Sequence, residues 1–151
     1  MPDTLASIHV SARQRYHDLM AVLRERADVQ ALYLTGSLQR EDQTADAWSD
    51  IDLTLVTRDP AAYRESEAWL REVASIDFRV LYTPRHLRVL FHDGVLLELG
   101  VFDEVDVRQP HPLLGIGAGR VILDRANLTD ALERVAGQHS PFEWSAAHGV
   151  G

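Results

Sequence analysis

Three carboxylates have the types and positions that metal-dependent chemistry needs. Asp50 and Asp52 stand one residue apart at the start of the alternating run IDLTLVT (51–57), and Glu98 stands inside the apolar run VLLELGVF (95–102). Residues two apart in a strand share a face, so the two aspartates point the same way. Like charges held side by side repel each other unless a cation lies between them, and carboxylates suit Mg²⁺ or Mn²⁺. We therefore predict a metal site at Asp50 and Asp52.

Glu98 is the third candidate ligand, because a glutamate is rarely buried without a partner in so apolar a strand. A metal shared with Asp50 and Asp52 would explain its position. Two alternatives stay open on the residues alone. Glu98 would also fit an ion pair with Arg79 or Arg88, and the aspartate pair would also fit a polar entry to its strand.

Gly36 and Ser37 directly follow the β-prone run VQALYLT (29–35). A glycine lets the backbone approach a phosphate, and a serine hydroxyl and backbone amides at the start of a helical turn donate to phosphate oxygens. Phosphate-binding groups beside metal-binding carboxylates are the machinery of nucleotidyl transfer, in which two metals activate a hydroxyl and stabilise the leaving pyrophosphate. We therefore expect the triphosphate of a nucleotide at Gly36 and Ser37.

The elements that position these residues follow from hydrophobic periodicity and from turn signals. In chain order, the pattern predicts helix 5–27, strands 29–35 and 51–57, helix 60–74, strands 76–82, 86–92 and 95–102, strand 120–124 and helix 129–136. Asp59-Pro60 predicts a helix start, with the Asp59 side chain as its cap.

Two links between these elements are also predicted. Asp93-Gly94 joins two apolar runs as a two-residue link, which indicates a hairpin. Residues 103–118 are expected to form a loop in which Asp103, Glu104 and Asp106 are solvated. Neighbouring strands without a crossover helix between them predict an α+β domain, with a mixed sheet flanked by helices.

These residues resemble the nucleotidyltransferase-fold superfamily, which includes polymerase-beta-like enzymes and the aminoglycoside nucleotidyltransferases. That superfamily has a Gly-Ser after its first strand, an Asp-x-Asp on its second and a third acid on a later strand. Gly36-Ser37, Asp50-Ile51-Asp52 and Glu98 match this pattern here. The stretch HDGVLLELGVF (92–102) is similar to the antibiotic-modifying branch, in which an Asp-Gly turn precedes the strand of the third acid.

The resemblance implies a nucleotidyltransferase domain over 1–138 with a C-terminal tail over 139–151. It implies a metal-dependent enzyme that transfers AMP from ATP to a hydroxyl, with Mg²⁺ or Mn²⁺ as the cofactor. The carried-over site residues are Asp50, Asp52 and Glu98 as catalytic and metal-binding residues, and Gly36, Ser37 and Arg40 as nucleotide-binding residues. Arg40 lies where the sequence departs from the Ala-Arg-Gly that is common in the superfamily.

The acceptor is left open by the resemblance. An aminoglycoside-like antibiotic is the first expectation. One alternative is a stand-alone antitoxin-type enzyme that modifies a partner toxin protein, and another is a nucleotide-binding module without turnover. Many antibiotic-modifying relatives also carry a second, helical domain that helps to bind the acceptor, and we expect none here. We therefore expect a homodimer or a hetero-complex, with Phe142 and Trp144 of the tail at the contact.

Composition sets the remaining expectations. The 151 residues have the length of one domain, and the lack of cysteine excludes disulfides and thiolate metal sites. A net charge of −8 makes a nucleic-acid partner unexpected and fits a cationic acceptor. With no basic-apolar leader and no apolar run of bilayer length, we expect a cytoplasmic protein without a membrane partner. The seven histidines show no ligand spacing and are expected on the surface or in loops.

Overall fold

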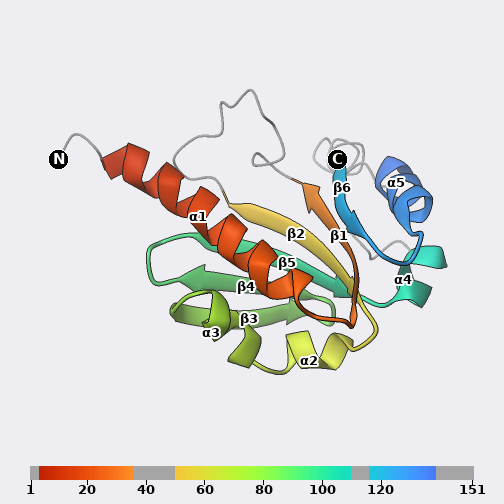
Figure 1. Ribbon diagram of the computed structural model, residues 1–151, viewed down its shortest axis with the longest axis horizontal. Helices are drawn as coiled ribbons and strands as arrows, with labels where there is room; N and C mark the ends of the chain where they lie inside the picture. Colours follow the sequence, from red (N-terminus) through yellow and green to blue (C-terminus); the bar gives the residue numbers. More distant parts are fainter. Residues whose placement is uncertain (1–3, 36–49, 110–115, 139–151) are drawn as a thin grey trace, which may run out of the picture.

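The computed structural model describes residues 4–35, 50–109 and 116–138, with side chains from residue 12 onward in these ranges. A six-stranded mixed sheet runs in the order β3-β4-β5-β2-β1-β6, and helices flank it (Figure 1). The predicted α+β architecture is confirmed. None of the described helices combines the length and the hydropathy needed to cross a membrane.

The elements follow the predicted chain order. They are α1 (Thr4–Arg24), β1 (Val29–Thr35), β2 (Ile51–Thr57), α2 (Pro60–Arg64), α3 (Ala68–Val73), β3 (Ile76–Thr83), β4 (His86–Phe91), β5 (Leu96–Phe102), α4 (Glu104–Arg108), β6 (Gly119–Asp124) and α5 (Thr129–Gln138). The last helix passes Gly137, where the sequence pattern placed its end.

The strand pairing divides the sheet into two antiparallel halves. The strands β3, β4 and β5 form one half, and β2, β1 and β6 form the other. The halves are joined where β2 runs parallel to β5, and this is the one parallel pair among the described strands.

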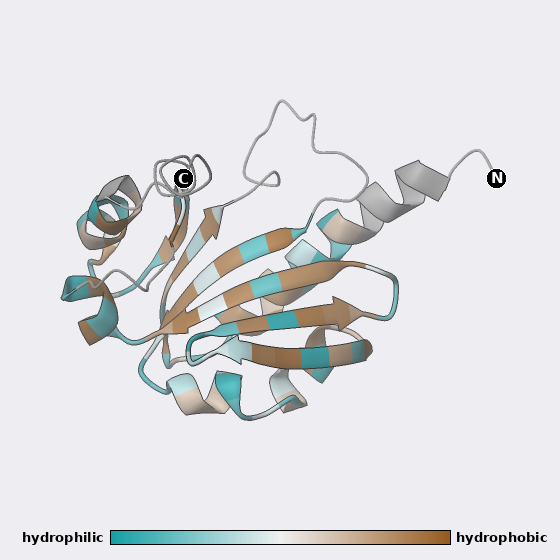
Figure 2. Ribbon diagram, turned by 180° about the vertical axis from the view of Figure 1, so that it is seen from behind, coloured by the Kyte–Doolittle hydropathy of each residue, from teal (hydrophilic) through white to brown (hydrophobic). Residues whose placement is uncertain are grey.

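Alternation along the strands gives the sheet two buried faces. On one face, Leu32 and Leu34 join the cluster that α1, α2 and α3 cover. On the other face, Ala31 and Tyr33 join a smaller cluster with α4 and α5. Figure 1 shows α1 lying across the sheet, with α4 and α5 beside β6 at one end. The smaller cluster leaves the β3–β4–β5 half of its face without a described helix over it, as Figure 2 shows.

The helix predicted over 60–74 is wrong as one element, because it breaks into α2 and α3. Residues six apart lie about 120° apart on a straight helix, so Tyr63 and Trp69 would not face the same way. The break allows both rings to be buried in edge-to-face contact, with centroids 5.2 Å apart, and the Trp69 indole donates to the Tyr63 carbonyl at 3.2 Å. Pro60 starts α2 as predicted, but the Asp59 side chain makes no capping hydrogen bond.

The loop expected over 103–118 is also wrong at its start, where α4 forms. Asp103 accepts from the Asp106 amide at 2.8 Å, and Asp106 accepts from the Asp103 amide at 3.2 Å, which makes a capping box. Asp106 also pairs with Arg85 at 2.9 Å. Glu104 pairs with Arg108 at 2.6 Å. The three carboxylates expected in a solvated loop are therefore engaged within the fold.

The hairpin predicted at Asp93-Gly94 is confirmed, but its link has three residues. The Phe91 amide donates to the Val95 carbonyl at 2.9 Å, so His92, Asp93 and Gly94 form the connection. Gly94 has φ 91°, a left-handed conformation that glycine adopts at little cost and that is typical of three-residue hairpin links.

Gly119 begins β6 in close contact with β1. A Cβ at this position would overlap the carbonyl oxygen of Leu34, and the Gly119 amide donates to the Tyr33 hydroxyl at 2.9 Å. We expect Gly119→Ala to destabilise the protein by about 3 kcal/mol, since backbone must move to relieve the overlap. Thermal melts followed by circular dichroism check this. Gly117→Ala is the control, because a Cβ at Gly117 would meet nothing within 4 Å. Equal melting temperatures for the two variants would contradict the close contact.

Candidate active site

One row of residues crosses all six strands on the face opposite α1. Strand registers place in this row Val80, Arg88, Glu98, Asp52, Thr35 and Gly119, from β3 to β6. At the centre of the row, Asp52 of β2 and Glu98 of β5 are register partners across the parallel pair. Two acids that the sequence placed on one face are therefore neighbours in space.

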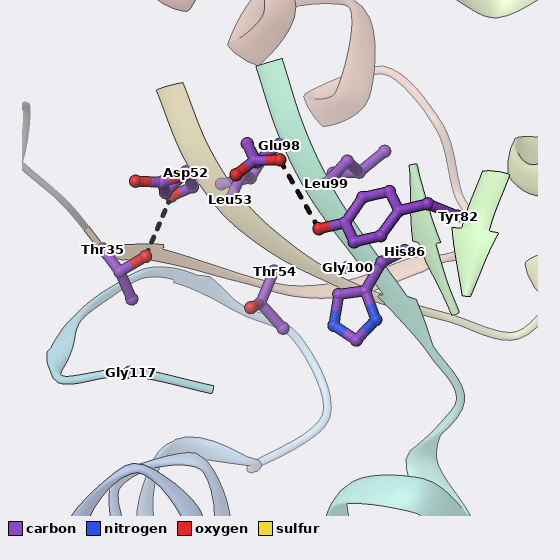
Figure 3. Close-up of a pocket in the computed structure, with 10 residues that line it drawn as sticks. All are labelled: Thr35, Asp52, Leu53, Thr54, Tyr82, His86, Glu98, Leu99, Gly100 and Gly117. Atoms are coloured by element: carbon purple, nitrogen blue, oxygen red, sulfur yellow. Dashed lines mark hydrogen bonds between the residues drawn. The ribbon is translucent and has the colours of Figure 1, made fainter. Parts of the chain in front are cut away.

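A cavity of about 190 Å³ lies over the middle of this row. Figure 3 shows the Asp52 and Glu98 carboxylates side by side at one edge, with Tyr82 and His86 at another. Thr54 and Thr35 also line it, and the Thr35 hydroxyl lies 3.4 Å from the Asp52 carbonyl. The polar side chains of five strands thus converge on one hollow.

Asp52 has the most perturbed carboxyl of the site. Burial raises its pKa, and the charges of Glu98 and Asp50 raise it further, to about 6. Both neighbours act because an ionised Asp52 is a like charge beside them. Asp50, which directly precedes β2, is half-buried. The fold therefore brings the three predicted acids close enough for Glu98 and Asp50 to raise the pKa of Asp52.

Glu98 is held by two side chains, one from the adjacent strand β4 and one from β3 beyond it. Arg88 donates to its Oε1 from Nε at 2.6 Å, and the Tyr82 hydroxyl lies 3.5 Å from the same oxygen. The Arg88 guanidinium stacks over the Tyr82 ring, 4.8 Å from its centroid. These contacts fix the orientation of the Glu98 carboxylate toward Asp52. The ion pair with Arg88 considered on sequence grounds is present, whereas Arg79 pairs in register with Val89 on the other face.

His86 was expected on the surface or in a loop, and this is wrong. It begins β4 and lines the cavity, with its ring 5.7 Å from Phe102 in edge-to-face contact. Its Nδ1 lies 2.7 Å from the Thr83 hydroxyl, which fixes the ring. The polar cavity residues that sequence reasoning missed are Thr35, Thr54, Tyr82 and His86. Two sequence signals could have placed Tyr82 and His86 on the face of the cavity. They are the alternation over 76–82 and the tight turn that follows it.

Several predicted residues lie outside the described part of the chain. They are Gly36, Ser37 and Arg40 of the expected nucleotide-binding segment, and Phe142 and Trp144 of the tail. Thr35, which lines the cavity, directly precedes that segment. The nucleotide-binding role of the segment stays a prediction.

Within the described ranges, no three His, Cys, Asp or Glu side chains are gathered closely enough to hold a metal ion. The donor chemistry nevertheless fits a divalent cation, because Asp52 and Glu98 are adjacent carboxylates whose repulsion raises the pKa of Asp52. The residues therefore suit Mg²⁺ or Mn²⁺, and the three-carboxylate ligand set stays a prediction.

Comparison with protein families decides the relationship. The streptomycin adenylyltransferase model matches residues 11–142, which is most of the chain. The chain belongs to this family. The resemblance to aminoglycoside-type nucleotidyltransferases is thereby confirmed.

Among solved structures, the chain is similar to an aminoglycoside 6-adenyltransferase from Bacillus subtilis. The TM-score is 0.46 and the sequence identity is 13%, over 65% of this chain and 36% of that one. This chain thus spans little more than a third of that enzyme's length. A search of curated proteins gave no match.

Proposed function

We propose that the protein transfers AMP from ATP to a hydroxyl group of a second molecule. The observation that carries this proposal is the register pairing of Asp52 with Glu98 at a cavity, in a member of the streptomycin adenylyltransferase family. Acids that perturb one another in a cavity are typical of catalytic sites. An ion pair between Arg88 and Glu98 that was only structural would not require a second carboxylate, that of Asp52, beside Glu98.

The proposed reaction is a single displacement at phosphorus. The acceptor oxygen attacks the α-phosphorus of ATP, the bond from that phosphorus to the pyrophosphate oxygen breaks, and pyrophosphate leaves. The triphosphate is expected at the segment that follows β1. Glu98 lies on the side of the row away from β1, which is the side of the acceptor, and it takes the hydroxyl proton. Arg88 and Tyr82 hold Glu98 through Oε1, which orients the carboxylate for this task.

The metal would be held by Asp52 and Glu98, with Asp50 beside them. When bound, Mg²⁺ or Mn²⁺ would neutralise phosphate charge and polarise the reacting oxygens. Without it, the three acids repel the triphosphate. We therefore expect EDTA to weaken ATP binding by at least about tenfold, measured by calorimetry with and without Mg²⁺. Undiminished ATP affinity in EDTA would contradict the metal assignment.

The names of the family and of the similar structure suggest streptomycin or another aminoglycoside as the acceptor. The net charge of −8 agrees with a cationic acceptor. A protein acceptor is the second candidate, and the exposed apolar residues of β3 next to the site favour it.

The experiment that tests the function follows the α-phosphate. The protein is incubated with ATP labelled in the α-phosphate, Mg²⁺ and each candidate acceptor, and pyrophosphate release is measured in parallel. We expect label on the acceptor and one pyrophosphate per label. Binding of ATP without any label transfer, across small-molecule and protein acceptors, would contradict the proposal and indicate a module without turnover.

A further inference from the structure

An apolar patch lies on the open half of the sheet, next to the carboxylates. We define it by five residues on the face of the cavity, namely Phe78, Val80, Tyr82, Leu90 and Leu96. The three residues from β3 are 42–46% exposed. In the described part of the chain, three of the five large exposed hydrophobic residues belong to this patch, and all three come from β3. Such a concentration on one strand is typical of an interaction site.

The patch is continuous with the proposed catalytic acids. Phe78, Leu90 and Leu96 form one cross-strand row, and Val80, Arg88 and Glu98 form the next. Tyr82 reaches Glu98 through its hydroxyl. A molecule seated on the patch would therefore extend to Glu98 from the side away from β1.

The part of the site nearest the patch carries a cation, whereas Asp52 and Asp50 lie beyond Glu98. The charged group between the patch and Glu98 is Arg88, a cation that already pairs with Glu98. The acids of α4 are engaged within the fold, since Asp106 pairs with Arg85 and Glu104 with Arg108. Local charge decides here, because the overall negative charge is screened within about 8–10 Å at physiological salt.

The dimensions of the patch suit several side chains of a protein. It spans three strands and five residues of β3, which is roughly 10 Å by 13 Å. The free edge of β3 is poorly suited to pairing with an added strand, because the register of β3 with β4 shifts at Asp77 and at Tyr82. Shifts of this kind twist an edge away from pairing. The sheet face, and not the edge, is therefore the docking surface.

We propose that the acceptor is a protein that docks its apolar side chains on this patch and presents a side-chain hydroxyl to Glu98. The inference rests on the proposed function and deepens it. The hydroxyl oxygen bonds to the α-phosphorus of ATP, pyrophosphate leaves, and the proton passes to Glu98, which leaves an AMP-modified protein. An aminoglycoside, which is polyhydroxylated and polycationic, offers too little apolar surface to cover the patch.

The test compares two variants that differ in the face they alter. Phe78→Thr with Val80→Thr removes apolar surface from the patch and keeps a residue type that favours strands. Leu81→Thr is the matched control, because Leu81 is 43% exposed on the same strand but pairs with Leu87, on the opposite face. Melting curves and ATP calorimetry establish that both variants fold and bind nucleotide.

The acceptors are offered separately. One reaction receives streptomycin and other aminoglycosides, and another receives a bacterial cell extract freed of small molecules by gel filtration, each with ATP labelled in the α-phosphate. We expect acid-precipitable label in the extract that resists ribonuclease. The patch variant should slow its formation by about tenfold or more, while Leu81→Thr leaves it unchanged. Higher extract concentrations should restore part of the rate, since docking is what the variant weakens.

Every other outcome would overturn either the protein acceptor or the proposed AMP transfer. Label on an aminoglycoside alone, label removed by ribonuclease, or protein label insensitive to the patch variant would overturn the protein acceptor and leave AMP transfer standing. ATP binding with no label on any acceptor would overturn AMP transfer, and the acceptor inference with it.

Discussion

Asp52→Asn is expected to lower the rate of AMP transfer by about 10³-fold and to raise the melting temperature of the metal-free protein. The rate falls because the variant lacks one of two carboxylates that would bind the metal, and removal of such a charge-stabilising group typically costs several kcal/mol in the transition state. The melting temperature rises because asparagine has no charge to keep beside Glu98 and Asp50 in a half-buried position. Loss of activity with a gain of stability is the mark of a residue kept for function.

The stability change should depend on pH, in a direction fixed by the raised pKa of Asp52. The folded protein holds this proton up to a pKa of about 6, whereas the unfolded chain releases it near its ordinary value of 3.8. Between these values the folded state binds more protons, so wild-type stability falls as pH rises. Asp52→Asn should match the wild type near pH 3.5 and exceed it by up to about 3 kcal/mol at pH 7.5.

Melting curves of both proteins across this pH range in EDTA test the expectation. Asp59→Asn is the control, since Asp59 lies exposed after β2 and makes no capping bond. Mg²⁺ should stabilise the wild type more than Asp52→Asn, which reports the metal independently of turnover. A variant that is less stable than the wild type at pH 7.5 in EDTA would show that Asp52 has a structural partner.

Glu98→Gln is the second large effect, because it separates a catalytic acid from an ion-pair partner. We expect transfer to fall by about 10²-fold or more, since glutamine neither takes the hydroxyl proton nor carries the charge of a metal ligand. ATP binding should change far less. The melting temperature should change little, because the lost pair with Arg88 is partly exposed and its loss is offset by weaker repulsion of Asp52.

Two measurements establish which role Glu98 has. Titration of Asp52 by NMR should show its pKa falling from about 6 in Glu98→Gln, since the Glu98 charge is one cause of the shift. Glu104→Gln is the matched control, because Glu104 also pairs with an arginine but lies on α4. If Glu98→Gln lowers the melting temperature strongly and leaves the single-turnover rate intact, Glu98 is an ion-pair residue only.

The strands and their faces were predictable because alternation is a local property. The ranges 29–35 and 51–57 agree with β1 and β2, and the burial of Ile51, Leu53 and Leu55 agrees with the predicted core face. That Asp52 and Glu98 would share a face followed from the same reasoning. Their position as direct partners did not follow, because register between strands distant in sequence is set by the packing of the whole sheet.

The partner of Glu98 shows how one residue in a turn changes a site. A two-residue link at Asp93-Gly94 would place Glu98 opposite Val89. The three-residue link shifts the pairing by one and places it opposite Arg88. The sequence signal for a turn was correct, but the backbone conformation of Gly94 decides the register.

The parallel pairing of β2 with β5 determines when the site forms as the chain folds. In sequence, α2, α3, β3 and β4 lie between the strands that carry Asp52 and Glu98. Hairpins such as β3–β4 and β4–β5 close within microseconds from local contacts, whereas a parallel pair requires the whole intervening segment to be ordered first. We therefore expect the proposed acceptor-docking strands to assemble early and the carboxylate pair to assemble late. A half-folded chain would then present its apolar patch before it is able to modify anything, which makes newly synthesised copies dependent on rapid completion of the sheet.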